Sequence, residues 1–508
     1  MKTTIKTLLV LMLLAGNAEA GVQPAWMQRY NAGRTRGRNE AVAMALDSRG
    51  NLIVAGSSWS AQGDFDYVML KYTPAGSNVW VRRYTSGGAS DDQVRALKID
   101  SQDNVHVTGT SVTIKYDSAG AQQWMAPYGG RALTCDTNGN VYVTGYLTND
   151  FSTVKLAVVG TNVWQRTHDM IGQNDVSHQV ILDADGNVYV AGPEIWFYEP
   201  RSRTSLQRFR VISYTPDGNS RFSTNFPTGY YPSPSMVRSL HIRGDSLLLS
   251  GNLNLDGALG RIFCIGRLDI TGDLSWSFSD WVNHSTIGVM GSDQAPNGDV
   301  FLTGGLLINF FGHTRFRTIK VRADQLGTNG EGTPAWQSDY VGANPGYNRA
   351  NAIGLDAVGN VYVTGQATGA GTETDRQDWA TLKYSPDGQE QWVQRYNGPA
   401  QLDDVATCMA VTPSGEVYVA GWSAVSSTLT ELVVIKYAEL ANIHVGPDQR
   451  AALQFFGTPG QSYRIDASTN LPNWESLGQF IADPAGIYRF LDTNAPNHPW
   501  RFYRTGPP

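Results

Sequence analysis

One short phrase returns eight times along this chain and restricts what the chain can fold into. Each copy joins a turn residue to alternating β-branched and aromatic residues and ends in a small residue followed by glycine. Val, Ile, Thr and Tyr favour strands, whereas the flanking Gly, Asn and Asp favour turns. A repeat built only from strand signals predicts an all-β protein, a β-propeller. The copies span residues 50–56, 103–109, 139–145, 186–192, 245–251, 298–304, 359–365 and 415–421.

Each repeat has the pattern of four strands joined by tight turns. An Asp-x-x-Gly turn precedes the phrase, as at 47–50, and the third strand ends in Lys-Tyr, as at 71–72. A second turn follows, such as Thr-Pro-Asp-Gly at 215–218, where Pro presets φ and Gly closes the hairpin. The fourth strand carries Trp and, four residues later, usually Tyr, as at Trp392 and Tyr396. This spacing places both rings on one face, so we expect them to pack between neighbouring sheets.

The order of the strands predicts how the ring closes. The eighth unit ends after its Lys-Tyr strand at 436–437 and has no Trp strand of its own. The missing strand lies at the other end of the chain, where 25–31 carries Trp26 and Tyr30 at the same spacing. This N-terminal strand is expected to complete the last blade and remove an exposed sheet edge. We favour eight four-stranded blades, with seven as the alternative if the fifth or sixth unit is not a blade.

A family resemblance accompanies the repeat. It is carried by Trp-x-x-Arg-Tyr-Asn at 392–397 and by the turn and strand phrases at 355–365 and 183–192. These stretches resemble the bacterial β-propeller repeat family known as SBBP repeats, over about residues 24–442. The resemblance implies an exported bacterial propeller and brings no catalytic motif with it.

The N-terminal end departs from the repeat. A positive first segment, the apolar run at 7–16 and small residues up to Ala20 predict a signal peptide over 1–20, cleaved before Gly21. We therefore expect a secreted protein, extracellular or at the cell surface, without a transmembrane segment. The propeller is predicted to occupy residues 21–442.

The C-terminal residues 443–508 change rhythm to short alternating strands between Gly and Pro turns, which predicts a small β-sandwich. The pattern over 459–504 resembles a β-module on exported proteins of environmental bacteria such as Verrucomicrobia and Planctomycetes. That resemblance implies surface retention, sorting or glycan contact. Trp474, Tyr463 and Tyr503 are candidates for a sugar-stacking platform. We expect them in the core instead, because so small a module needs its aromatic residues inside.

Composition and motifs exclude several classes of function. The net charge is −6, and no basic block resembles the footprint of a nucleic-acid-binding protein. The chain contains no His-Glu-x-x-His, Gly-x-Ser-x-Gly or Walker motif. An Asp-rich turn at 183–187 lacks the distal Glu of a calcium-binding EF-hand loop. We therefore expect no metal, no cofactor and no catalytic residue.

One set of polar residues recurs at the entrance to the innermost strands. Most repeats carry Asp or Asn eight positions before the first turn, and several carry a basic residue three positions further on. Equivalent strands encircle the axis of a propeller, so these residues should gather at one mouth of its channel. They form a candidate site for a cation, sugar or peptide, or they cap turns between blades. The outer ring is Asn39, Asp92, Asp175, Asn348 and Asp404, and the inner ring includes Arg95, Arg131 and His178.

Three functions are open at this point. We favour an exported, non-enzymatic binding or scaffold protein that presents its loops and channel mouth to a protein or glycan partner. The second is a propeller polysaccharide lyase or glycosidase; a glycosidase needs two carboxylates at a defined separation. The third is a structural repeat protein of the cell surface. We expect a monomer that has no nucleic-acid partner.

Overall fold

The computed structural model describes most of the chain beyond the predicted signal peptide, which lies outside the described residues. The described residues are 22–506 except 88–89, 148–149, 169–175, 200–203, 226–235, 255–260, 271–275, 281–285, 308–311, 327–329, 332, 345, 370–375, 440–441, 446–449, 457–461, 471–472, 482–486 and 499–500.

The first four blades are antiparallel sheets whose strands lie in sequence order. The short strands follow from the repeat, because each tight turn reverses a run of β-branched and aromatic residues. Blade 1 is β2 (Asn39–Leu46), β3 (Leu52–Trp59), β4 (Phe65–Tyr72) and β5 (Asn78–Tyr84); blade 2 is β6 (Val94–Ile99), β7 (Val105–Gly109), β8 (Thr113–Tyr116) and β9 (Gln122–Ala126); blade 3 is β10 (Ala132–Cys135), β11 (Val141–Leu147), β12 (Asp150–Leu156) and β13 (Asn162–His168); blade 4 is β14 (Gln179–Leu182), β15 (Val188–Glu199), β16 (Thr204–Tyr214) and β17 (Ser220–Asn225).

The remaining blades repeat this order with two variations. Blades 5 and 6 join into one nine-stranded sheet through a single pair, Arg261 with Thr286, and β25 (Gly330–Glu331) pairs with β21. Blade 5 is β18 (Met236–Arg243), β19 (Ser246–Asn254), β20 (Arg261–Asp269) and β21 (Trp276–Asp280); blade 6 is β22 (Thr286–Gln294), β23 (Val300–Leu307), β24 (Thr314–Val321) and β26 (Trp336–Tyr340), with the 3-10 turn η1 (Ala323–Gln325); blade 7 is β27 (Arg349–Leu355), β28 (Val361–Thr368), β29 (Gln377–Tyr384) and β30 (Glu390–Tyr396).

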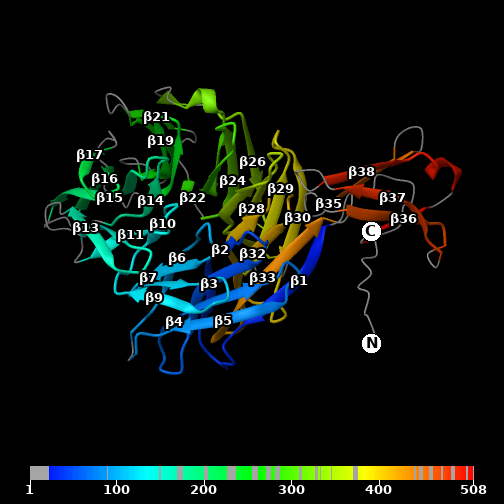
Figure 1. Ribbon diagram of the computed structural model, residues 1–508. Helices are drawn as coiled ribbons and strands as arrows, with labels where there is room; N and C mark the ends of the chain where they lie inside the picture. Colours follow the sequence, from blue (N-terminus) through cyan, green and yellow to red (C-terminus); the bar gives the residue numbers. More distant parts are fainter. Residues whose placement is uncertain are drawn as a thin grey trace.

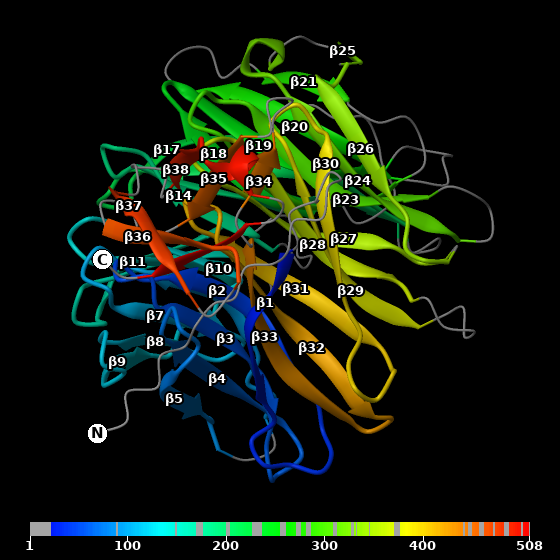
Figure 2. The ribbon, with the colours of Figure 1, turned by 90° about the vertical axis from the view of Figure 1, so that its right-hand side faces the viewer.

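The last blade takes one strand from the start of the chain. It contains β31 (Asp404–Val411), β32 (Val417–Ser426) and β33 (Leu429–Glu439), and β1 (Val22–Tyr30) pairs antiparallel with β33. Both the fifth and the sixth unit form four-stranded blades, so the described residues contain the favoured eight. Figures 1 and 2 show the blades arranged around an axis, with the first strand of each blade toward the centre.

The core lies between blades rather than inside any one of them. One cluster joins Leu52 and Val68 of blade 1 to Tyr418 and Leu432 of blade 8, so the last sheet packs on the first. Tryptophans of the outer strands pack against the next blade, as their spacing predicted. Trp164 of β13 donates from Nε1 to the carbonyl of Pro216, 3.0 Å away in the following blade.

A lysine reinforces this inter-blade clamp. Lys155 Nζ donates to the same Pro216 carbonyl at 3.0 Å, and the Trp164 ring covers Gly218. The lysine near the end of the third strand, the Trp strand and the Gly-containing turn of the next blade therefore form one clamp, which recurs between several pairs of neighbouring blades. Its tryptophan and lysine donate to shared carbonyls at Pro74 (Trp26, Lys436), Ser118 (Trp80, Lys71) and Pro386 (Trp336, Lys320).

The C-terminal module consists of two three-stranded sheets that share one core, as predicted for a small sandwich. Tyr503 is buried there, and the ring of Tyr463 stacks on that of Tyr488 with centroids 4.9 Å apart. Figure 1 shows the module to one side of the propeller. The sheets are β34 (Asn442–Val445), β35 (Ala451–Phe456) and β38 (Ile487–Asp492), and β37 (Glu475–Ile481), β36 (Ser462–Ser468) and β39 (Phe502–Gly506), with the turn η2 (Ala495–Asn497).

Candidate functional site: the mouth of the central channel

The innermost strand of each blade has an irregularity at the same place. In six blades the ladder skips a residue there, which is a β-bulge; in blade 6 the ladder skips a second residue as well, Ile287. In blades 3 and 4 the equivalent residues, Arg131 and His178, lie just before the first ladder pair and donate their N–H to Thr144 and Ala191. A bulged residue has no partner across the ladder, so the bulge re-aims its side chain. The eight are Val42, Arg95, Arg131, His178, Arg238, Met290, Asn351 and Thr407.

Several of these bulge residues also connect the blades. In each case the side chain donates to the carbonyl of the residue that precedes the bulge in the next blade. The bond from β31 to β2 links the last blade to the first. The pairs are Arg238 Nε with Val289 O at 3.1 Å, Asn351 Nδ2 with Ala406 O at 2.8 Å, and Thr407 Oγ1 with Ala41 O at 2.6 Å.

The two asparagines of the predicted outer ring are buried and fully hydrogen bonded. Asn348 Oδ1 accepts from the N–H groups of Gly342 at 3.0 Å and Thr368 at 2.9 Å. Its Nδ2 donates to Thr314 O of the preceding blade at 2.8 Å. Asn39 Nδ2 donates in the same way to the carbonyl of Thr430 at 2.7 Å. These contacts are those of the turn-capping alternative.

The aspartates of the outer ring lie in comparable positions. Asp404 Oδ2 accepts from the N–H of Gly398 at 2.6 Å, and Asp92 Oδ2 accepts from the N–H of Ser86 at 2.6 Å. Both residues are buried. Burial raises the pKa of Asp404 to about 6, because desolvation disfavours the charged carboxylate. Asp175 lies outside the described residues.

The inner ring is closer to open space. Arg95 and Arg131 line a cavity of about 100 Å³ beside Gly129 and Gly130. Burial, and then the charges of Arg131 and Arg238, lower the pKa of His178 to about 4, so this imidazole is neutral at pH 7. The structure therefore brings Arg131, His178 and Arg238 close enough to interact electrostatically.

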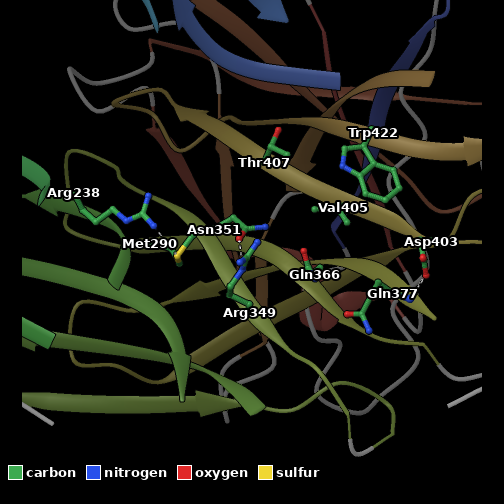
Figure 3. Close-up of a pocket in the computed structure, with 10 residues that line it drawn as sticks. All are labelled: Arg238, Met290, Arg349, Asn351, Gln366, Gln377, Asp403, Val405, Thr407 and Trp422. Carbon is green, nitrogen blue, oxygen red and sulfur yellow. Dashed lines mark hydrogen bonds between the residues drawn. The ribbon is translucent and has the colours of Figure 1, made fainter. Parts of the chain in front are cut away.

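A larger cavity of about 550 Å³ opens on the other side of the channel mouth. Four of its residues are bulge residues: Arg238, Met290, Asn351 and Thr407. The side chains come from the inner strands of blades 5 to 8 and from the second and third strands of blades 7 and 8, and Figure 3 shows them around one hollow. The others are Arg349, Gln366, Gln377, Asp403, Val405 and Trp422.

Sequence reasoning missed the outer wall of this cavity, although a signal was present. Gln366 and Trp422 occupy the same repeat position, directly after the glycine that ends the signature phrase. Blade 1 carries Ser57 at that position and blade 2 carries Thr110. The third unit carries Tyr146 there, but only the seventh and eighth units are neighbours that both have a large residue with hydrogen-bonding capacity at this position.

Several polar groups of this wall lack protein partners within the described part of the chain. The Gln366 amide and the Trp422 indole N–H make no hydrogen bond there. Arg349 donates from Nε to Asn351 Oδ1 at 2.9 Å, and its guanidinium lies 5.8 Å from the Tyr347 ring centroid. One oxygen of Asp403 accepts from the backbone N–H of Gln377 at 3.0 Å. The cavity thus offers an indole, an amide, a guanidinium and a carboxylate to a ligand.

Comparisons with known proteins find solved structures of low similarity. No protein-family model matches the chain, and no curated protein matches it. The WD40 domain of SCAP from fission yeast is 8% identical and covers 82% of this chain and 98% of its own, with a TM-score of 0.42. Hsv2p of Kluyveromyces lactis is 11% identical, and the match covers 70% of this chain and 97% of Hsv2p, with a TM-score of 0.39. PorZ, a surface component of the type-IX secretion system of Porphyromonas gingivalis, is 12% identical. The match covers 89% of this chain and 73% of PorZ, with a TM-score of 0.25. These similarities carry no functional argument.

The described residues also bear on metal binding and on membrane insertion. They contain no cluster of three or more His, Cys, Asp or Glu side chains arranged to hold a metal ion. None of their helices has the length and apolar character needed to cross a membrane.

Proposed function

We propose that this chain is an exported, non-enzymatic binding protein that holds a saccharide in the 550 Å³ cavity at its channel mouth. The observation that carries the proposal is the cavity wall formed by Trp422, Gln366, Arg349 and Asp403. Within the described residues the Gln366 amide and the Trp422 indole N–H make no hydrogen bond, while Arg349 and Asp403 each use one side-chain atom in a bond to a neighbour. The volume lies within the range of about 300–1,000 Å³ that is usual for ligand pockets.

The chemistry of this wall matches a sugar. A pyranose ring has apolar C–H faces that pack on an indole and hydroxyl groups that need both donors and acceptors. Trp422 supplies the aromatic face, Gln366 supplies a donor and an acceptor, and Asp403 supplies an acceptor. Leaving these groups unpaired in the free protein costs little where water reaches them, and a ligand then replaces the water.

The hydrolase alternative has less support from the same residues. A glycosidase of the usual kind needs two carboxylates flanking the scissile bond. Among the described residues that line this cavity, Asp403 is the one carboxylate. Asp404 has a raised pKa, but it is buried and bound to the N–H of Gly398, so its carboxyl group does not face the cavity. No described contact favours a purely structural surface role.

A glycan array followed by calorimetry on the mature chain tests the proposal. We expect Trp422→Ala to abolish saccharide binding while the melting temperature stays near that of the wild type. Trp474→Ala, in the C-terminal module, is the control, and it should bind as the wild type does. Loss of binding in the control alone would move the site to the module. An array on which no saccharide binds would refute the proposal.

A further inference from the structure

The cavity at the channel mouth has charges of opposite sign at its two ends. Figure 3 shows Arg238 and Met290 at one end and Asp403 with Gln377 at the other, with Arg349 and Asn351 between them. The lining includes two guanidinium groups and one carboxylate, and the carboxylate lies at the exposed rim. The part nearest the axis is therefore basic.

Among the basic residues of this cavity, Arg349 is the one best placed to bind an anionic group of a ligand. It is half-buried on β27, and Asn351 Oδ1 holds its Nε at 2.9 Å, which fixes the plane of the guanidinium. Within the described residues it forms no ion pair. A guanidinium held in this way presents its terminal N–H groups as a fork that matches a carboxylate.

Other arginines lie at the same channel mouth. Arg238 lines the same cavity as Arg349, and Arg95 and Arg131 line the smaller cavity on the other side of the mouth. The two arginines nearest His178 contribute to the lowered pKa of that imidazole, after burial. Clustered charges of one sign in a concave site raise the local concentration of ligands of the opposite sign.

From this geometry we infer that the ligand is an acidic saccharide, one whose sugar carries a carboxylate, bound with that carboxylate on Arg349 beside Arg238. The inference rests on the proposed function, because it adds a charge requirement to the same cavity. Trp422 then packs on a sugar ring, and Asp403 at the rim accepts hydroxyl groups from the part of the ligand that points outward.

The test compares matched ligands by calorimetry on the mature chain. The probes are trigalacturonate, trimannuronate and a hyaluronan tetrasaccharide, each beside its methyl ester, which keeps the sugar and removes the charge. We expect at least one acid to bind about tenfold or more tighter than its ester, because charge-assisted bidentate bonds are the strong ones. Arg349→Gln should abolish the preference for the acid over its ester. Added salt should weaken binding of the acid but not binding of the ester. Arg95→Gln, outside this cavity, is the control and should retain the preference.

The two proposals fail in different ways. If acid and ester bind equally and Trp422→Ala abolishes both, the saccharide site stands and the charge requirement is wrong. If Arg349→Gln keeps the full preference for the acid, the assignment of the carboxylate to Arg349 is wrong. If no saccharide binds in any form, or if only an acidic peptide binds, both proposals are overturned.

Discussion

Gly218 offers the sharpest test of the inter-blade clamp. It has a φ of +81°, and the Trp164 ring of the preceding blade covers it. A Cβ at this position would lie 2.7 Å from Trp164 Cδ2 and 2.8 Å from Cγ, well inside van der Waals contact. Gly218→Ala therefore adds two costs at once, backbone strain and a steric clash with the clamp.

The size of the effect follows from these two terms. A non-glycine residue in the left-handed region costs about 1–2 kcal/mol. Overpacking a well-packed site costs about 1–3 kcal/mol. If Trp164 moves to relieve the clash, its bond to the Pro216 carbonyl is strained as well, at a net cost of about 1 kcal/mol. We expect Gly218→Ala to lower the free energy of unfolding by about 2–5 kcal/mol.

Gly63→Ala is the matched control. Gly63 has a φ of +89°, and a Cβ there meets nothing within 4 Å. The free energy of unfolding of this variant should be lower than that of the wild type by only the backbone contribution of about 1–2 kcal/mol. The measurement is urea unfolding followed by tryptophan fluorescence and circular dichroism, with a check that both probes report one transition. Equal destabilisation of the two variants would refute the clamp as an energetic unit.

Three further predictions concern single side chains near the channel. Burial raises the pKa of Asp404 to about 6 from 3.8, so its stabilising contribution is present below about pH 4 and lost as the pH rises through 6. Asp404→Asn places at this position the residue that blade 7 has as Asn348. The free energy of unfolding of this variant should depend less on pH and should be higher at pH 7 by up to about 3 kcal/mol. An unchanged slope of the free energy of unfolding against pH between pH 4 and 6 would contradict this. Burial lowers the pKa of His241 to about 4, so the stability that its neutral form contributes above about pH 6.5 should be lost as the pH drops through 4. In acid unfolding curves, the free energy of unfolding of His241→Gln should fall less over this range than that of the wild type. Thr407→Val removes the bond to Ala41 O and should cost about 1–3 kcal/mol, with faster hydrogen exchange in β2 and β31; unchanged exchange would mean that the bond does not hold the last blade to the first.

The structural basis of the repeat was largely predictable from the sequence. Strand order depends on local signals, because turn residues and alternating β-branched residues act within a few positions of one another. Trp164 and its equivalents could be placed between sheets from spacing alone, since a separation of four residues keeps two side chains on one face. The role of the N-terminal strand followed from the Trp26 pattern in the same way.

The candidate site was only partly predictable. The pattern of Asp and Asn before the inner strands indicated equivalent positions around the axis, and the same positions in the structure cap backbone groups. Sequence could not decide between capping and binding for Asn348, because the answer depends on N–H groups that Gly342 and Thr368 bring to it. It likewise could not show that the bulge aims Arg238 and Asn351 into open space.

The sequence by itself determined most of what repeats: the strands, the turns and the tryptophans that pack between sheets. These properties are encoded locally in each copy, so the spacing of residues along the chain suffices to find them. The sequence left seven and eight blades open, and the described residues contain eight. Only the tertiary structure showed where differences between the copies create a cavity, because Gln366, Trp422 and Arg349 come from two neighbouring blades and line the same space. A cavity is a property of side chains from several strands at once, and their mutual distances are set by packing.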